Sequence, residues 1–251
     1  MIELKNICAG YEKNIVIKGL STIFEKGKLI SIIGVNGCGK STLLKTIVGI
    51  IPSSSGEILI DGECLGNMTR TEVARKIAYL AQGKNTPDMT VEQLVLHGRF
   101  PYLNYPRRYS EKDRELAFSA MKKVGLAECV GKPLHTLSGG MRQNAYIAMA
   151  LAQDTSYILL DEPTTYLDIS HQLKLMKTLK ELAESGKGII AVMHDLPMAF
   201  DFSSEILLIN NGSISMRSTP EEVCKFPVIE TVFGISLRRS QDGKNYYYQW
   251  R

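Results

Sequence analysis

The sequence contains no apolar run that approaches the length of about 20 residues that a membrane-spanning helix needs. A cleavable N-terminal signal is also lacking. We therefore expect a chain that does not itself cross a membrane. Internal repeats, low-complexity tracts and long flexible linkers are absent too, which favours one folded domain over residues 1–251.

Cysteine is scarce, and its five occurrences are scattered without any C-x-x-C pair. This spacing argues against a disulfide framework or a zinc site and fits a reducing compartment. The excess of positive charge is also small, with a net charge of +4. It is weak support for a nucleic-acid partner, and we expect none. The hydrophobic fraction of 44% is that of a folded globular protein.

The stretch 29–42, LISIIGVNGCGKST, has the clearest pattern in the chain. Residues 29–33 predict a buried strand, and the next residues match the P-loop pattern G-x-x-x-x-G-K-[ST] in front of a helix. The glycines let successive backbone N–H groups point at phosphate oxygens, and the helix N-terminus adds positive potential. The predicted nucleotide-binding residues are Gly34, Asn36, Gly37, Cys38, Gly39, Lys40, Ser41 and Thr42.

Two of these side chains have separate expected roles. Lys40 is expected to reach the β- and γ-phosphates, and the Ser41 hydroxyl to ligate Mg²⁺. The alternative is a glycine-rich turn that binds nothing. The strand before the loop, the helix after it and the Lys-Ser pair all argue against that alternative.

Strand and helix signals alternate along the rest of the chain. Three capping boxes, which begin at Thr69, Thr90 and Ser110, predict helix starts, and Asn211-Gly212 predicts a hairpin. Residues 52–56 are expected to form a loop, and 236–251 a second hairpin. The predicted strands are 2–7, 20–25, 57–60, 77–80, 157–160, 188–193, 206–209 and 213–215, with a helix over 169–184 and a helical insertion over 83–156.

Two further motifs make the chain resemble the ATP-binding subunits of ABC transporters. Leu137-Ser138-Gly139-Gly140 precedes a helix, and the strand 157–160 ends in Asp161-Glu162. Alone, each is typical of a helix cap or a strand end. Together, behind a P-loop, they are similar to the signature motif and the Walker B motif of that family. The resemblance implies an α/β fold, in which a P-loop NTPase core with an N-terminal antiparallel β-subdomain (about 1–82 and 157–251) carries an inserted α-helical signature subdomain (about 83–156).

The resemblance also implies roles for residues outside the P-loop. Tyr11, expected in a loop, matches the aromatic residue that stacks on adenine. Gln82 matches the glutamine that ligates Mg²⁺ and senses the membrane partner, and Asp161 matches the aspartate that holds the metal. Glu162 is the implied general base, and His194 the implied histidine near the γ-phosphate.

Dimerisation is a further implication of the family. Asp168 matches the family's D-loop aspartate, and Ser138, Gly139 and Gly140 would donate to the nucleotide of the opposite subunit. Two copies would then enclose two ATP molecules head to tail. Such a homodimer would lie on the cytoplasmic face of the membrane, bound to integral permease subunits and served indirectly by a solute-binding protein.

The sequences around the motifs resemble those of the ATPases that import ferric siderophores. The similar stretches are 97–102, 145–153, 161–168 and 170–172. Importers of haem, vitamin B12 or metal ions remain alternatives, as does a soluble ABC-type ATPase. A P-loop small-molecule kinase would have no reason to carry the LSGG motif or His194. The aromatic segment 100–105 is either part of the permease-docking groove or an ordinary surface loop.

Four residues depart from the family pattern. Val35 replaces a common proline, Met141 a glutamine and Asn144 an arginine, and we expect activity to survive these changes. Cys38 places a thiol beside the bound phosphates. Because helix-end N–H groups favour an anion, we expect Cys38 to form a reactive thiolate. Alkylation of this thiol should inhibit the protein, and bound ATP should protect Cys38 from alkylation.

Overall fold

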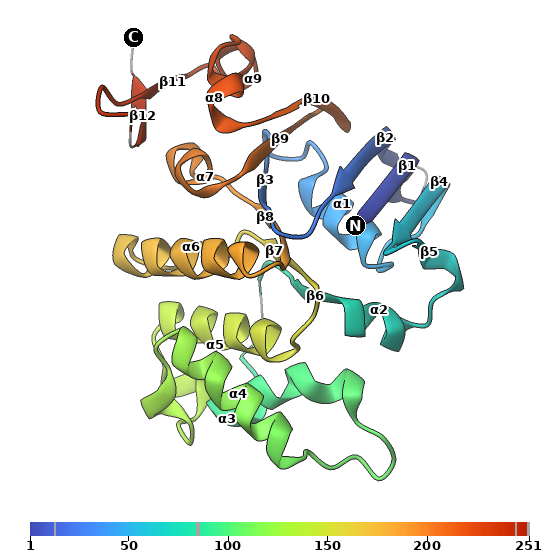
Figure 1. Ribbon diagram of the computed structural model, residues 1–251, viewed down its shortest axis with the longest axis vertical. Coiled ribbons are helices and arrows are strands. Elements are labelled where there is room, and N and C mark those ends of the chain that lie inside the picture. Colours follow the sequence, from blue (N-terminus) through green and yellow to red (C-terminus); the bar gives the residue numbers. More distant parts are fainter. Residues whose placement is uncertain (13, 84–85, 244, 250–251) are drawn as a thin grey trace.

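The computed structural model describes residues 1–12, 14–83, 86–243 and 245–249. Within these residues, an antiparallel sheet lies beside a larger, mostly parallel sheet, and a group of helices extends from one side (Figure 1). The antiparallel sheet has the order β2-β1-β4-β5. Its strands are β1 (Ile2–Tyr11), β2 (Asn14–Phe24), β4 (Ser53–Ile60) and β5 (Glu63–Cys64).

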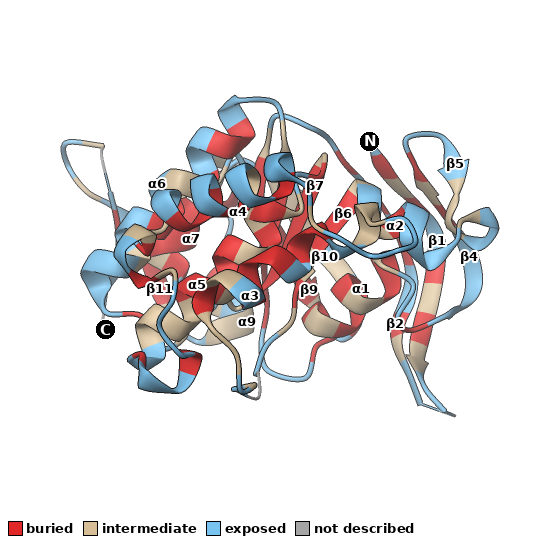
Figure 2. Cartoon of the chain, turned by 90° about the horizontal axis from the view of Figure 1, so that it is seen from below, coloured by how far each residue is buried: buried red, intermediate tan, exposed pale blue. Residues whose placement is uncertain are grey.

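The larger sheet has the order β10-β9-β3-β8-β7-β6 and is parallel except for its edge strand β10. Every residue of β3, β7 and β8 is buried, as expected for parallel strands that are covered on both faces (Figure 2). The strands are β3 (Leu29–Ile33), β6 (Ile77–Leu80), β7 (Tyr157–Asp161), β8 (Gly188–Val192), β9 (Glu205–Asn210) and β10 (Ser213–Ser218).

The larger sheet separates two apolar clusters, one on each of its faces, and helices cover both. Helix α1 (Lys40–Ile47) packs in the cluster that the larger sheet shares with the antiparallel sheet. Helices α6 (Ile169–Glu184) and α7 (Leu196–Phe202) pack in the cluster on the other face. No helix in the described parts of the chain is both long and apolar enough to span a membrane.

The group of helices has an apolar cluster of its own. A buried ion pair also holds it together, because Arg99 Nε lies 2.9 Å from Asp113 Oδ1 and the Arg99 guanidinium donates to the carbonyls of Ala152 and Gln153. Its elements are α3 (Val91–Leu96), η2 (His97–Tyr102), α4 (Glu111–Lys123), η3 (Ala127–Cys129), η4 (Leu134–Thr136) and α5 (Gly139–Ala152).

Most local signals in the sequence are confirmed. The three capping boxes open α2 (Arg70–Lys76), α3 and α4. Asn211-Gly212 connects β9 to β10, and β11 (Ser236–Arg239) pairs with β12 (Tyr246–Gln249); the last two residues of that predicted hairpin lie outside the described chain. Helix α7 and three short helices, η1 (Leu65–Asn67), α8 (Pro220–Cys224) and α9 (Val228–Phe233), were not predicted from the sequence.

Two predicted loops are strands instead. Residues 53–56 belong to β4, and Gly10-Tyr11 ends β1 rather than lying in a loop. Antiparallel pairing explains the first difference, because Cys8 lies opposite Ser55 and Ala9 opposite Ser53. Such pairing with a distant strand supplies hydrogen bonds that a run of serines does not reveal.

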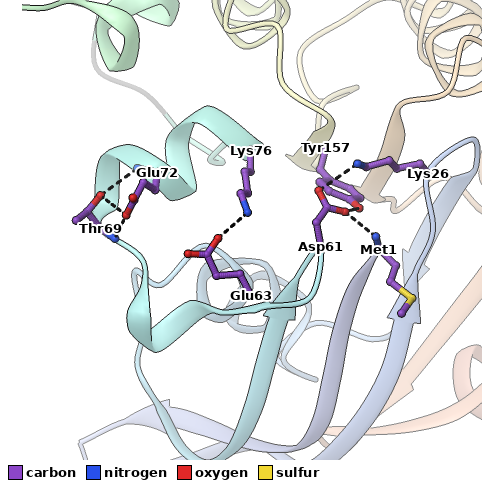
Figure 3. A network of polar contacts seen from close by, with 8 residues as sticks. All are labelled: Met1, Lys26, Asp61, Glu63, Thr69, Glu72, Lys76 and Tyr157. Atoms are coloured by element: carbon purple, nitrogen blue, oxygen red, sulfur yellow. Dashed lines mark hydrogen bonds and ion pairs between the residues drawn. The ribbon is translucent and has the colours of Figure 1, made fainter.

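A polar network joins the antiparallel sheet to β7 (Figure 3). Asp61 lies in the turn between β4 and β5, and its carboxylate accepts hydrogen bonds from the Tyr157 hydroxyl at 2.7 Å, the Met1 ammonium at 2.7 Å and Lys26 at 3.1 Å. Because Tyr157 begins β7, these bonds anchor the strand that ends in Asp161.

Candidate functional site

The P-loop connects β3 to α1 through Gly34 and Gly39, two positions at which any side chain would be strained. A Cβ atom on Gly34 would lie 2.3 Å from the carbonyl oxygen of Ile209, and one on Gly39 would lie 2.7 Å from Ile17 Cδ1. Both glycines also have positive φ, at 154° and 109°. Lys40 is buried, and its ammonium donates to the carbonyls of Gly34 at 2.7 Å and Val35 at 3.0 Å.

A cavity of about 530 Å³ lies against the P-loop, at the carboxyl ends of the parallel strands. This edge is where ligands bind in open α/β sheets. Most of the predicted site residues line it, although they come from segments far apart in the sequence. The lining residues are Tyr11, Val16, Asn36, Gly37, Gly39, Lys40, Ser41, Thr42, Gln82, Glu162 and His194.

Asp161 lies at the end of β7 with 2% of its surface exposed, and it accepts a 2.9 Å hydrogen bond from the Ser41 hydroxyl. Burial raises the pKa of Asp161 above its ordinary value, and the nearby Glu162 charge adds to that rise, while the Ser41 hydrogen bond opposes it. A cation bound there would remove this cost. The hydroxyl of Ser41, the carboxylate of Asp161 and the nearby amide of Gln82 are hard oxygen donors, which is the chemistry that Mg²⁺ prefers.

Glu162 follows Asp161, and side chains from two other strand ends hold its carboxylate. Gln82 Nε2 donates to Oε2 at 2.5 Å, and His194 Nε2 lies 2.5 Å from Oε1. The backbone of Glu162 has a φ of 52°, in the left-handed region that few non-glycine residues occupy. Backbone strain of this kind concentrates at functional sites, where the surrounding structure enforces it.

The remaining predicted residues do not line the cavity. Ser138 caps α5 by accepting from Met141 N at 3.3 Å, and Gly139 and Gly140 lie against the backbone near Tyr166. Asp168 caps α6, and the hydrogen bond from the His171 N–H is the largest cause that lowers the pKa of Asp168, to about 2. The signature residues and Asp168 therefore occupy a surface separate from this chain's own cavity.

The expectation of a Cys38 thiolate is wrong. Cys38 has 5% of its surface exposed and packs in the apolar cluster beneath the P-loop, not in the cavity. Burial raises the pKa of the Cys38 thiol, and the positive charge of Lys40 does not reverse that rise. Desolvation thus outweighs the attraction that the helix end was expected to supply.

From the sequence, Asn144 was interpreted differently, and Val16 and Thr165 were not singled out. Asn144, where the family has arginine, is buried and donates to the carbonyl of Val124 at the end of α4. Val16 lines the cavity beside Gly39, and the Thr165 hydroxyl lies 3.4 Å from Glu162 Oε2. Neither Val16 nor Thr165 belongs to a spacing pattern that would have marked it.

Comparison with known proteins places this geometry in a family. The family model described as ABC transporter matches residues 17–165. The chain belongs to the ABC transporter family. Its resemblance to that family and its α/β fold class are thereby confirmed, as is the predicted class of enzyme, an ATPase.

Relatives and solved structures match nearly the whole ABC cassette. The petrobactin import ATP-binding protein FpuD of Bacillus anthracis is 40% identical over 96% of this chain and 89% of its own length. The ferric enterobactin transport ATP-binding protein FepC of Escherichia coli (strain K12) is 41% identical over 92% of this chain and 86% of its own length. The dimeric structure of MJ0796, a bacterial ABC transporter cassette, is 29% identical with a TM-score of 0.77, over 88% of this chain and 99% of that one.

Proposed function

We propose that this chain is the ATP-binding and ATP-hydrolysing subunit of an ABC importer for ferric siderophores. The observation that carries the activity is the convergence of Lys40, Ser41, Gln82, Glu162 and His194 on one cavity. The ferric siderophore is carried over from relatives named for petrobactin and enterobactin that match over 92% or more of the chain. A related importer of haem, vitamin B12 or a metal ion is the alternative.

ATP binding follows from the surfaces that line the cavity. The exposed Tyr11 ring offers a π-face on which adenine can stack, and Val16 adds an apolar contact next to it. The P-loop N–H groups and the N-terminus of α1 bind the phosphates. Lys40 then exchanges its bonds to the Gly34 and Val35 carbonyls for bonds to phosphate oxygens.

For hydrolysis, Ser41, Gln82 and Asp161 would hold Mg²⁺, which when bound neutralises charge on the phosphate oxygens. Glu162 would accept a proton from the attacking water. Gln82 and His194 each contact one of its oxygens, and a carboxylate has about four lone-pair sites, so the attacking water can bind there as well. In this proposal His194 turns from Glu162 to donate to the γ-phosphate.

We propose that a second copy of the chain completes each site. Phosphoryl transfer depends on donors that surround the γ-phosphate, and one copy supplies them from one side only. The positions of Ser138, Gly139, Gly140 and Asp168 outside the chain's own cavity support a head-to-tail homodimer with two ATP molecules. ATP favours the closed dimer because it contacts both copies, and hydrolysis removes that preference.

In this proposal the chain lies on the cytoplasmic face of the membrane, bound to integral permease subunits that a solute-binding protein serves. In this proposal residues 1–251 form one cassette, in which the helical subdomain (about 83–156) is inserted into the catalytic core. The exposed side chains of Phe100 and Tyr105, the latter 97% exposed, support a docking surface on the segment 100–105, which follows Gln82 in the sequence. Arg99 is buried, and its guanidinium lies 4.1 Å from the ring centre of the half-buried Tyr102.

Co-purification from membranes tests this function. The tagged chain is isolated with its partners, and ATP hydrolysis is measured with and without a solute-binding protein loaded with ferric siderophore. Stimulation in the wild type, and its loss in Lys40→Ala, is the expected result. Stimulation by haem or cobalamin instead would keep the activity and correct the substrate. Absence of any membrane partner would favour a soluble ABC-type ATPase.

A further inference from the structure

Tyr79 lies on the strand next to the one that carries Asp161, and the two side chains are on the same face of the sheet. It belongs to β6, and in the parallel register with β7 it lies opposite Leu159. Asp161 is two residues beyond Leu159, and side chains two apart on a strand share a face. Diagonal neighbours of this kind are within reach of an aromatic side chain. That face is covered by α1, which carries Ser41.

The hydroxyl of Tyr79 is fully buried and has no hydrogen-bond partner in the described parts of the chain. Its ring packs against the apolar cluster under α1. Burial raises the pKa of Tyr79, and the negative charge of Asp161 raises it further. The hydroxyl therefore lies close to the Asp161 carboxylate, although no hydrogen bond of ordinary length joins the two. Buried hydroxyls that lack a partner are rare and need an explanation.

Asp161 has unused capacity in the same space. Within the described residues, Ser41 is its side-chain hydrogen-bond donor, and that bond engages Oδ1. A group that offers both a donor and an acceptor between Tyr79 and Asp161 would satisfy both residues. A water molecule has that chemistry, because an ordered buried water needs two to four polar partners. Mg²⁺ usually keeps several of its own waters when it binds to a protein.

We infer that Tyr79 is a positioning residue of the Mg²⁺ site, whose hydroxyl binds a water ligand of the metal and so fixes that water relative to Asp161. This inference rests on the proposed ATPase function. Groups that orient metal ligands in this way typically change metal affinity by about 10- to 100-fold when they are removed. Tyr79 acts on the metal and not on the nucleotide, so its loss should separate the two affinities.

The chain contains a matched control. Tyr246 also has a buried hydroxyl without a hydrogen-bond partner among the described residues, and 8% of its surface is exposed. It packs edge-on against Phe200 of α7, with the ring centres 5.3 Å apart, and does not line the cavity. Tyr79→Phe and Tyr246→Phe therefore remove the same group from comparable surroundings, but only one of them lies beside Asp161.

The test measures binding of a fluorescent ATP analogue to the full chain, first in EDTA and then during a Mg²⁺ titration. Tyr79→Phe is expected to bind the analogue like the wild type in EDTA, while the Mg²⁺ concentration at half-maximal effect rises about 10-fold. The same shift is expected in the Mg²⁺ dependence of hydrolysis. Tyr246→Phe is expected to match the wild type in all three measurements.

Thermal unfolding in EDTA separates positioning from a structural role. Because the Tyr79 hydroxyl has no protein partner, Tyr79→Phe should melt no lower than Tyr246→Phe. A much lower melting temperature, or an unchanged Mg²⁺ midpoint, would overturn the inference. Weaker analogue binding to the same degree in EDTA and in Mg²⁺ would overturn it as well. A wild type that hydrolyses no ATP would instead refute the proposed function.

Discussion

Glu162 combines a left-handed backbone with a carboxylate held on both oxygens by Gln82 and His194. Its N–H also donates to the carbonyl of Val192, which ties the strained turn to β8. Three strand ends thus determine the position of one side chain. Such a position is what a general base requires, because the proton acceptor has to lie within hydrogen-bond reach of the attacking water.

Glu162→Gln is expected to lower ATP hydrolysis by at least about 100-fold, because the amide cannot accept the proton. ATP binding is retained, and the closed dimer accumulates since the bridging phosphate is not removed. Size-exclusion chromatography with ATP measures the dimer. Glu184→Gln, which removes an exposed carboxylate at the end of α6, serves as the control. A Glu162→Gln variant that stays monomeric with ATP yet hydrolyses normally would refute the role.

The buried Cys38 should react slowly with alkylating agents, since the thiolate is the reactive form and burial raises the pKa of this thiol. Cys8 is a useful reference. A hydrogen bond with the Ser55 side chain, followed by one from the Gly19 N–H, lowers the pKa of its thiol. Brief labelling with iodoacetamide and mass spectrometry should therefore find Cys8 modified before Cys38. Equal labelling that ATP suppresses only at Cys38 would restore the expectation of a reactive thiolate.

At the scale of elements, β7 has to be held at both ends for the site to form. Its last residue is Asp161, and its first, Tyr157, donates to Asp61 in the turn of another sheet. Burial alone would raise the pKa of Asp61. The hydrogen bonds from the Met1 ammonium, Tyr157 and Lys26 outweigh that effect and lower the pKa to about 2.

A carboxylate whose pKa is lower in the folded state stabilises the fold at pH values above its pKa in the unfolded chain, which is about 3.9. That contribution is lost as the pH falls toward 2. Asp61→Asn should therefore lower the free energy of unfolding by about 2 kcal/mol at pH 7. The difference from the wild type should shrink between about pH 4 and pH 2. Urea unfolding at several pH values measures it, with the exposed Glu57→Gln on β4 as control. A difference that does not depend on pH would contradict the assignment.

The arrangement of the whole molecule separates two sets of residues to which the proposed function assigns roles in hydrolysis. The P-loop and Glu162 line the cavity, whereas Ser138 and its neighbouring glycines lie at the start of α5 beside Tyr166. Tyr166 is 77% exposed and has a φ of 69°, an uncommon conformation for an aromatic residue. An exposed, strained aromatic beside the signature residues is consistent with a surface that meets another molecule.

Mixing two inactive variants tests whether that molecule is a second copy. Lys40→Ala destroys the P-loop contribution, and Ser138→Arg blocks the signature. If the two act across the dimer, the mixed dimer retains one intact site, which combines the P-loop of one copy with the signature of the other. Neither variant alone should hydrolyse ATP, but an equimolar mixture should. A mixture as inactive as its components would show that Ser138 acts within its own chain.

The features that the sequence predicted correctly depend on neighbours in the chain. The P-loop, three capping boxes and the Asn211-Gly212 turn each need only a few adjacent residues. Features that depend on residues distant in the sequence were not predicted or were predicted wrongly. Residues 53–56 are extended because β1 pairs with them, Val16 lines the cavity because β2 passes the P-loop, and Cys38 is buried by the packing around it. The individual roles of the site residues stay predictions.

The order of the larger sheet has a consequence for the synthesis of the chain. β3, which leads into the P-loop, ends at residue 33, but its two neighbours β8 and β9 begin at residues 188 and 205. At roughly 5–20 residues per second, translation needs about ten seconds or more to supply them. For that interval a mostly apolar strand has no partner on either edge. The sheet that positions the P-loop can therefore form only after the residues of β9 have been synthesised.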